Sequence, residues 1–252
     1  MKRTKKLIVG NWKMNPLTVE EAKKIATQVK RSMRLVKKVD VVLCPPFVYI
    51  PLLSKTVDKN LYLGAQDAFY EEKGSFTGEV SFRELTQFNV SFVILGHSER
   101  RKMGETDQLI NKKVRSVVGQ GMEAIVCVGE SIRDTHGDYF QFVKDQILWA
   151  IRDVPTKLLS RVVIAYEPIW AIGAKDAMSP MDLHEMSIYI KKVLKDYCGD
   201  LSNEVRILYG GSADKVNAEA LVKEGNVSGL LVGRQSLNST DFSEMIKIID
   251  TI

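Results

Sequence analysis

The sequence predicts an α/β protein, a (β/α)8 barrel built as a single domain from residues 1–252. Eight short apolar runs rich in β-branched residues recur along the chain, and most are almost continuously hydrophobic, as expected for parallel strands covered on both faces. Segments with helical spacing of apolar residues separate these runs. Repeats of about thirty residues fill the length of a closed eightfold barrel better than that of an open doubly wound sheet.

The predicted strands cover residues 7–12, 39–44, 61–65, 92–97, 124–129, 162–167, 205–209 and 229–233. The first is followed by a turn without the Gly-x-Gly-x-x-Gly pattern of a dinucleotide-binding sheet. Three of the intervening segments show helical periodicity most clearly, with apolar residues at 25, 29, 33 and 36, at 109, 114, 117 and 118, and at 183, 186, 190, 193 and 194. No Gly-, Ser- or Pro-rich linker marks a domain boundary.

Charge and cysteine content exclude several classes of protein. The net charge of +5 comes largely from the first six residues and from a helix around residues 30–38, where a solvated outer face explains it better than nucleic-acid binding. Three widely spaced cysteines, in no CxxC pattern, favour a reducing compartment over a disulfide framework or a zinc site. Residues 7–9 are too short an apolar run for a signal peptide, and no run reaches membrane length, so we expect a cytoplasmic protein.

The segment from Tyr166 to Gly173 is the most informative in the chain. Glu167 ends an apolar strand, and an unpaired carboxylate is costly in a core, so we expect it at the mouth of the barrel. Pro168 and two bulky apolar residues follow in loop position, which is typical of a lid that closes over a site. A carboxylate beneath a lid indicates proton abstraction in a pocket shielded from water.

Polar residues at other strand ends are further candidates. Asn11 and Lys13 lie two apart and face the same way if the first strand continues that far. A lone lysine is usually a solvated surface charge, whereas one at this mouth could stabilise a developing oxyanion. His97 stands beside a helix start that Ser98 is expected to cap, and the helix dipole favours a neutral ring. A lone histidine is usually structural, but one in line with Lys13 and Glu167 favours catalysis.

The last two predicted strands end in glycines. Gly210 and Gly211 precede Ser212, and Gly233 precedes Arg234. Backbone N–H groups at such positions can approach an anion closely, which predicts a phosphate seat, although a pair of glycines alone is also an ordinary turn.

Five motifs occur in a fixed order: Gly-Asn-Trp-Lys-Met-Asn at 10–15, Gly-His-Ser-Glu-Arg-Arg at 96–101, Val-Gly-Glu at 128–130, Tyr-Glu-Pro-Ile-Trp-Ala-Ile-Gly at 166–173 and Tyr-Gly-Gly-Ser at 209–212. With them the chain resembles the triosephosphate isomerase family from about residue 6 to residue 252. The resemblance implies a TIM barrel that interconverts dihydroxyacetone phosphate and D-glyceraldehyde 3-phosphate without a metal or an organic cofactor.

The resemblance also implies roles for individual residues. Glu167 matches the base, His97 the neutral electrophile, Lys13 the electrostatic stabiliser of the enediolate, and Asn11 its neighbour. Glu99 matches a partly buried acid that holds Lys13 and the helix start.

Further implied residues concern the phosphate and the partner subunit. The phosphate is expected to meet main-chain N–H groups of Gly173, Ser212, Gly233 and Arg234 under a lid formed by residues 168–178. The loop at 65–81 matches a segment that packs into a second subunit and implies a homodimer, with Thr77 at the partner's site.

Two departures from the family pattern stand out. The lid continues as Ala-Lys-Asp-Ala-Met at 174–178 where the family usually has Thr-Gly-Lys-Thr-Ala, which leads us to expect an active enzyme with altered lid dynamics. Arg234 replaces a second glycine. If the backbone there has a positive φ, the arginine is strained; if φ is negative, its N–H still serves and its side chain adds a charge near the phosphate.

Two other functions remain as alternatives. Another sugar-phosphate barrel is disfavoured by the complete set of Asn11, Lys13, His97 and Glu167. A barrel kept as a scaffold without turnover is motivated only by the changes in the lid and at Arg234.

Overall fold

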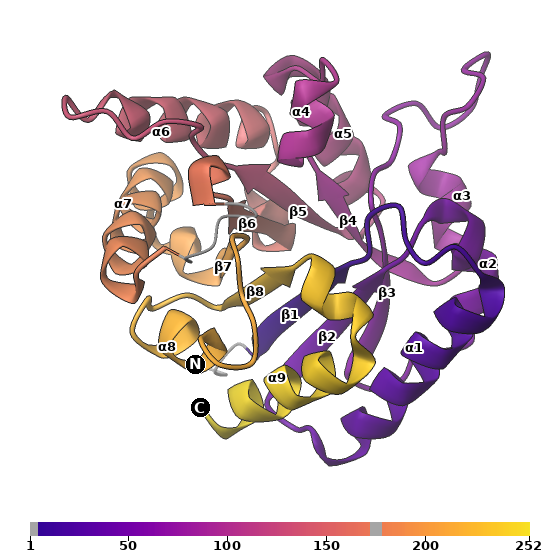
Figure 1. Ribbon diagram of the computed structural model, residues 1–252. Helices are drawn as coiled ribbons and strands as arrows, with labels where there is room; N and C mark the ends of the chain where they lie inside the picture. The colour runs from indigo at the N-terminus through magenta and orange to yellow at the C-terminus, as the bar shows by residue number, and fades with distance from the viewer. Residues whose placement is uncertain (1–4, 172–177) are drawn as a thin grey trace.

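The computed structural model, which describes residues 5–171 and 178–252, contains a closed barrel of eight parallel strands in sequential order (Figure 1). This confirms the predicted fold class. The strands are β1 Lys6–Asn11, β2 Val39–Cys44, β3 Leu61–Ala65, β4 Val90–Leu95, β5 Glu123–Val128, β6 Val162–Tyr166, β7 Arg206–Tyr209 and β8 Gly229–Val232. β1 pairs with β8 as well as with β2, for example Val9 with Leu231 and with Val42, which closes the ring.

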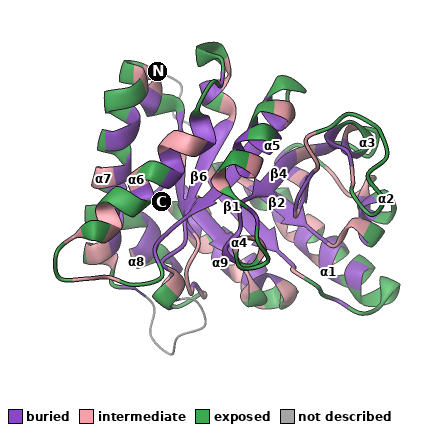
Figure 2. Ribbon diagram, turned by 90° about the horizontal axis from the view of Figure 1, so that it is seen from above, coloured by how far each residue is buried: buried purple, intermediate pink, exposed green. Residues whose placement is uncertain are grey.

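Helices surround the barrel (Figures 1 and 2). They are α1 Val19–Ser32, α2 Ile50–Leu53, α3 Phe82–Thr86, α4 Ser98–Lys102, α5 Asp107–Gly119, α6 Asp138–Ile151, α7 Pro180–Cys198, α8 Ala218–Lys223 and α9 Ser239–Thr251. Short 3-10 turns are η1 Met33–Leu35, η2 Phe47–Tyr49, η3 Thr156–Arg161, η4 Ile169–Ala171, η5 Gly199–Glu204 and η6 Arg234–Leu237.

Local sequence explains where these helices begin and end. α1 starts at Thr18, whose side chain accepts the N–H of Glu21, and it has acidic residues in its first turn and basic residues in its last. α7 starts with Ser179 as N-cap and proline in its first turn. The first predicted helix is shorter than its periodicity indicates, because the chain tightens into η1 and Val36, although buried, has extended backbone.

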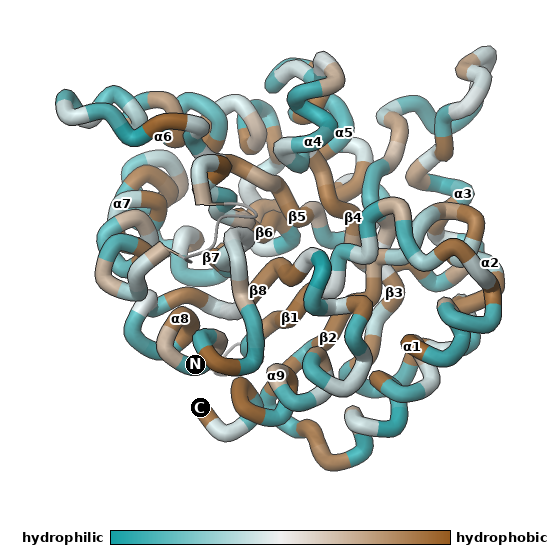
Figure 3. The backbone as a smooth tube through the Cα atoms, in the orientation of Figure 1, coloured by the Kyte–Doolittle hydropathy of each residue, from teal (hydrophilic) through white to brown (hydrophobic). Residues whose placement is uncertain are grey.

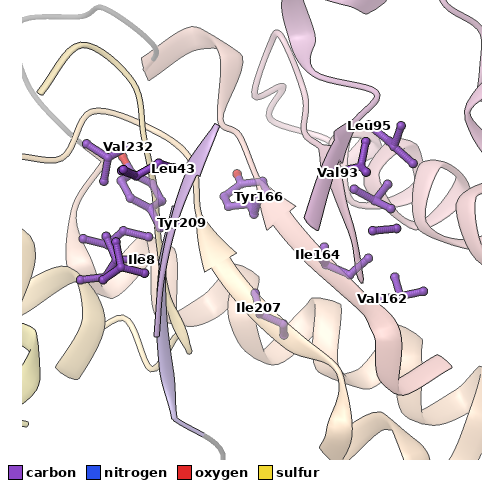
Figure 4. Close-up of a cluster of buried hydrophobic side chains, with 14 of the residues drawn as sticks. Ile8, Leu43, Val93, Leu95, Val162, Ile164, Tyr166, Ile207, Tyr209 and Val232 are labelled. Carbon is purple, nitrogen blue, oxygen red and sulfur yellow. The ribbon is translucent and has the colours of Figure 1, made fainter. Parts of the chain in front are cut away.

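Two apolar clusters make up the core. The larger lies between the strands and the helices; Figure 4 shows part of it, including Ile164, Tyr166 and Tyr209. The smaller fills the barrel with residues such as Val9, Ala165 and Cys127. The strands accordingly form a hydrophobic centre and the outer helix faces are polar (Figure 3). Cys127 is a buried packing thiol, as its place in an apolar strand indicates, and burial raises its pKa well above the ordinary value.

Several predicted strands extend one or two residues too far at their carboxyl ends. Residues 12, 96–97, 129, 167 and 233 all lie beyond the strands to which we assigned them. The backbone leaves the ladder at these points because it turns into the loops that carry the polar residues.

Candidate active site

A cavity of about 540 Å³ opens where the strands end. The residues predicted for the site that lie within the described part of the chain all line it: Asn11, Lys13, His97, Glu99, Glu167, Ser212, Gly233 and Arg234. Gly173 lies outside the described residues, as do the lid positions 174–177. Residues that are far apart along the chain, and that the sequence marks as candidates, therefore share one cavity.

Glu167 lies one residue beyond β6 and is only 2% exposed. It lines the cavity as predicted, but it is buried because it has partners: Oε1 lies 3.1 Å from His97 Nε2, and Oε2 accepts the N–H of Ser98 at 3.1 Å. These contacts shield the carboxylate from water and hold it beside the imidazole of His97.

His97 itself caps α4, whereas we predicted Ser98 for that position. Its Nδ1 accepts the N–H of Glu99 at 3.2 Å, and Ser98 becomes the first helical residue. A ring nitrogen that accepts an N–H carries no proton, so the ring is neutral and its proton is on Nε2, facing Glu167. This arrangement agrees with the expectation of a neutral imidazole. The N-cap of α4 is therefore His97 and not the predicted Ser98.

Lys13 lies beyond the strand, which ends at Asn11, so the condition for the two side chains to align along one strand is not met. Its backbone is left-handed, with φ of 54°, and its N–H is accepted by Asn11 Oδ1 at 3.0 Å. Gln66 Nε2 donates to the Lys13 carbonyl at 2.8 Å. These contacts hold a conformation that is unusual for a lysine and keep the ammonium at the cavity.

Glu99 accepts a hydrogen bond from Lys13 Nζ at 2.6 Å. Burial acts to raise the pKa of Glu99, but the hydrogen bond and charge of Lys13 outweigh it and lower that pKa. The side chain is 54% exposed, more open than the partly buried acid we expected, because it stands on the first turn of α4 at the rim. It pairs with Lys13 as predicted, while His97 rather than Glu99 caps the helix.

After β7 and β8 the cavity lining includes Ser212 and Gly233, and the chain enters η6 at Arg234. Arg234 is not among the described residues with positive φ, so the strained alternative is wrong and the unstrained one holds. Its N–H stands at the start of η6, and the residue is on the cavity lining.

The described ends of the segment predicted to form a lid are tied to neighbouring loops. Ile169 N–H donates to the Glu130 carbonyl at 2.9 Å, and the Trp170 indole donates to the Glu130 carboxylate at 2.8 Å. At the far end Met178 N–H donates to the Tyr209 hydroxyl at 3.3 Å, and burial raises the pKa of Tyr209 to about 12. Tyr209 therefore stays protonated at neutral pH and holds the Met178 N–H through an uncharged hydroxyl.

Several of these residues received no individual role from the sequence, although Glu130 stands in the Val-Gly-Glu motif and Gln66 in the loop at 65–81. Gln66 follows β3 directly and Glu130 follows β5 by two residues, so the rule that drew attention to the other strand ends would have found both. Asp214 and Asn217 also line the cavity but lie further along their loop, where no local signal marks them.

Within residues 5–171 and 178–252, no group of three or more His, Cys, Asp or Glu side chains is arranged to hold a metal ion. In the same described ranges, none of the helices has both the length and the apolar character that a bilayer crossing requires.

Comparison with known proteins identifies the family. The family model for triosephosphate isomerase matches residues 6–249. The chain is 41% identical over 246 residues to the triosephosphate isomerase of Alkaliphilus oremlandii, covering 96% of this chain and 98% of that protein. It is 40% identical over 244 residues to that of Thermoanaerobacter pseudethanolicus (95% and 98%) and 37% identical over 246 residues to that of Endomicrobium trichonymphae (96% and 98%). The chain belongs to the triosephosphate isomerase family.

Proposed function

We propose that Glu167 is the general base with which this chain moves a proton between two carbons of a bound triose phosphate. Family membership makes the chain an isomerase that interconverts dihydroxyacetone phosphate and D-glyceraldehyde 3-phosphate. The observation that carries the proposed roles is the 3.1 Å approach of Glu167 to His97 on the lining of a cavity that also includes Lys13.

The chemistry follows from what each group can do. A carboxylate can accept a proton from carbon, and abstraction of a carbon-bound proton places negative charge on the adjacent oxygen. The Nε2–H of His97 donates a hydrogen bond to that oxygen, and the ammonium of Lys13 stabilises the charge, with Asn11 as a further polar neighbour. Glu167 then returns the proton to the neighbouring carbon, which completes the isomerisation. Because the reaction only relocates a proton and bonding electrons within one molecule, it needs neither a metal nor an organic cofactor.

The phosphate is proposed to bind to main-chain N–H groups of Gly173, Ser212, Gly233 and Arg234. In support, the three of these residues that the structure describes line the cavity and lie in the loops after β7 and β8. Phosphate sites in eightfold barrels commonly use these two loops.

We also propose a homodimer in which loop 65–81 carries Thr77 into the partner's site. Residues 71–79 are exposed, and the segment before α3 projects away from the barrel (Figure 1). Phe76 packs on Phe69 with ring centroids 4.6 Å apart, which stiffens the projecting loop. Gln66, at the base of this loop, holds the Lys13 carbonyl, so that docking of the loop would also support the site.

Two broader expectations remain proposals. We infer that residues 1–252 act as one barrel domain. We also infer a cytoplasmic protein, a location that agrees with the three free cysteines of the chain.

Glu167→Gln tests the catalytic assignment. Glutamine keeps the size and the hydrogen bond from Ser98 but cannot accept a proton, so kcat should fall by about 10²- to 10⁴-fold while 2-phosphoglycolate still binds. Turnover from glyceraldehyde 3-phosphate is measured by coupling to glycerol-phosphate dehydrogenase. An unchanged kcat would refute the assignment to Glu167, and a wild-type protein without turnover would favour the scaffold alternative.

Thr77→Arg tests the dimer. A bulky charge in the docking loop should produce a monomer in light scattering and lower activity, whereas Val216→Arg, on a side chain that is exposed elsewhere, should do neither. A monomeric wild-type protein with full activity would exclude the proposed interface.

A further inference from the structure

Arg234 lies on the lining of the cavity with the residues proposed to hold the phosphate. It follows Gly233 immediately after β8, and it is exposed to solvent at the cavity. The main-chain contacts proposed for this residue do not use its side chain.

The other charged groups on the cavity lining already have partners. Lys13 pairs with Glu99 at 2.6 Å, and Glu167 is held by His97 and Ser98. Asp214 Oδ1 accepts the N–H groups of Val216 at 2.8 Å and Asn217 at 3.0 Å. Each of these groups therefore has at least one hydrogen-bond or ion-pair partner.

Arg234 differs from these groups because its guanidinium has no hydrogen bond or ion pair with any residue in the described ranges of the chain. Lys13 and Arg234 are the two Lys or Arg side chains among the described lining residues, and Lys13 is engaged. A guanidinium without a partner among residues 5–171 and 178–252 provides a full positive charge and a planar set of N–H donors suited to phosphate oxygens.

We propose that the guanidinium of Arg234 binds the phosphate dianion of the substrate directly, in addition to the main-chain contacts, and so sets the affinity of this enzyme for phosphorylated ligands. The inference rests on the proposed function, since it assumes that this side of the cavity holds the phosphate. Arg234 acts as a substrate-binding residue and takes no part in proton transfer.

Binding of 2-phosphoglycolate to Arg234→Gln, measured by calorimetry, tests the inference. Loss of a hydrogen-bonded charge should weaken binding by about 10- to 100-fold. KM for glyceraldehyde 3-phosphate should rise with it, and kcat should change less. Arg234→Lys keeps the charge without the planar set of donors and should fall in between. Lys247→Gln removes one positive charge from the exposed face of α9 and should alter binding by less than about twofold, because salt screens distant charges.

The salt dependence of binding distinguishes a direct charge contact from a purely structural role of Arg234, because a structural role would not change it. Wild-type affinity should fall with added sodium chloride more steeply than that of Arg234→Gln, and thermal melts establish that both variants are folded. Equal affinity of the wild type and Arg234→Gln, or equal salt slopes, would overturn the inference while leaving the proposed function intact. A wild type that binds no 2-phosphoglycolate and shows no turnover would overturn both.

Discussion

Replacing Lys113 with methionine removes the only cation that is fully enclosed in a buried charge cluster within the described part of the chain. Lys113 lies on α5, is 1% exposed and donates to both oxygens of Asp67, at 2.9 and 2.8 Å, and to Glu105. Arg100 reaches the same two carboxylates from α4, at 2.8 Å to Asp67 and 3.3 Å to Glu105. The cluster thereby joins the base of loop 65–81 to the helix that begins at His97.

Methionine fills a similar volume but leaves two buried carboxylates with one partly exposed arginine. Breaking a buried ion pair by removing one partner typically costs about 3–5 kcal/mol, because the remaining charge is uncompensated. We expect Lys113→Met to lose that much free energy of unfolding near neutral pH. Lys112→Met is the matched control: Lys112 is the exposed neighbour whose ammonium lies 4.9 Å from the ring centroid of Tyr70, and its loss should cost about 1 kcal/mol or less.

The deficit should depend on pH in a defined direction. Burial raises the pKa of Asp67, and the charge and hydrogen bond of Lys113 act to lower it. Removing Lys113 therefore raises this pKa further. A carboxyl whose pKa is higher in the folded state binds protons on folding, so its contribution to stability is fully present at low pH and is lost as pH rises through the folded-state pKa. The deficit of Lys113→Met should be largest near about pH 8 and smaller near about pH 5.

Urea unfolding at one fixed protein concentration, followed by circular dichroism, measures these differences. The double variant Asp67→Asn with Lys113→Met also removes one of the two uncompensated carboxylates, so it should recover part of the lost free energy of unfolding. If Lys113→Met lowered the free energy of unfolding by less than about 1 kcal/mol, as expected for Lys112→Met, then Lys113 would not be compensating buried charges. A deficit that grows as pH falls would refute the assignment to Asp67.

Three further predictions concern the site and its surroundings. A Cβ at Gly210 would lie 2.8 Å from Glu167 Cγ, so Gly210→Ala should displace the base and lower kcat by about 10²-fold in the coupled assay, since misplacements of this size are costly in catalysis. Glu130→Gln replaces a buried carboxylate that accepts the indole N–H of Trp170, and should lower stability in urea by about 1–3 kcal/mol and change the tryptophan fluorescence. Because burial raises the pKa of Cys127, its thiol should not react with Ellman's reagent until the protein is unfolded.

Each of these has an outcome that would contradict it. Gly119→Ala, where an added Cβ meets no atom within 4 Å, is the control for Gly210→Ala and should leave kcat unchanged. Equal activity of the two alanine variants would mean that Glu167 is not displaced. Unchanged fluorescence in Glu130→Gln, or rapid labelling of Cys127 in the native protein, would contradict the other two.

Much of the fold could be predicted because the barrel strands are buried on both faces. Continuous apolar runs locate β2 and β3 with their observed bounds, Val39–Cys44 and Leu61–Ala65. Long-range pairings between polar groups could not be predicted in the same way. Nothing near Lys113 in the sequence indicates that this helical lysine would form an ion pair with Asp67, which lies 46 positions earlier in the chain. Such partners are set by the packing of α5 on the barrel, which periodicity alone does not specify.

Side-chain alternation accounts for part of the candidate site. The interior of the barrel continues from Leu7 and Val9 to Asn11, and from Val163 and Ala165 to Glu167, so that two polar residues take the next inward positions. At the corresponding positions after four other strands the residue is glycine, which leaves room at the mouth; these are Gly96, Gly129, Gly210 and Gly233.

His97 does not fit this alternation, and the reason shows what the sequence pattern leaves out. Phe92 and Ile94 point into the barrel, so an extended strand would direct His97 outward. The chain instead turns at Gly96, where φ is +66° and a Cβ would meet Ile110 at 2.8 Å. That turn lets His97 cap α4 and face Glu167. The pairing of acid and imidazole therefore depends on one backbone position that only glycine can readily occupy, and a strand pattern read residue by residue could not have predicted it.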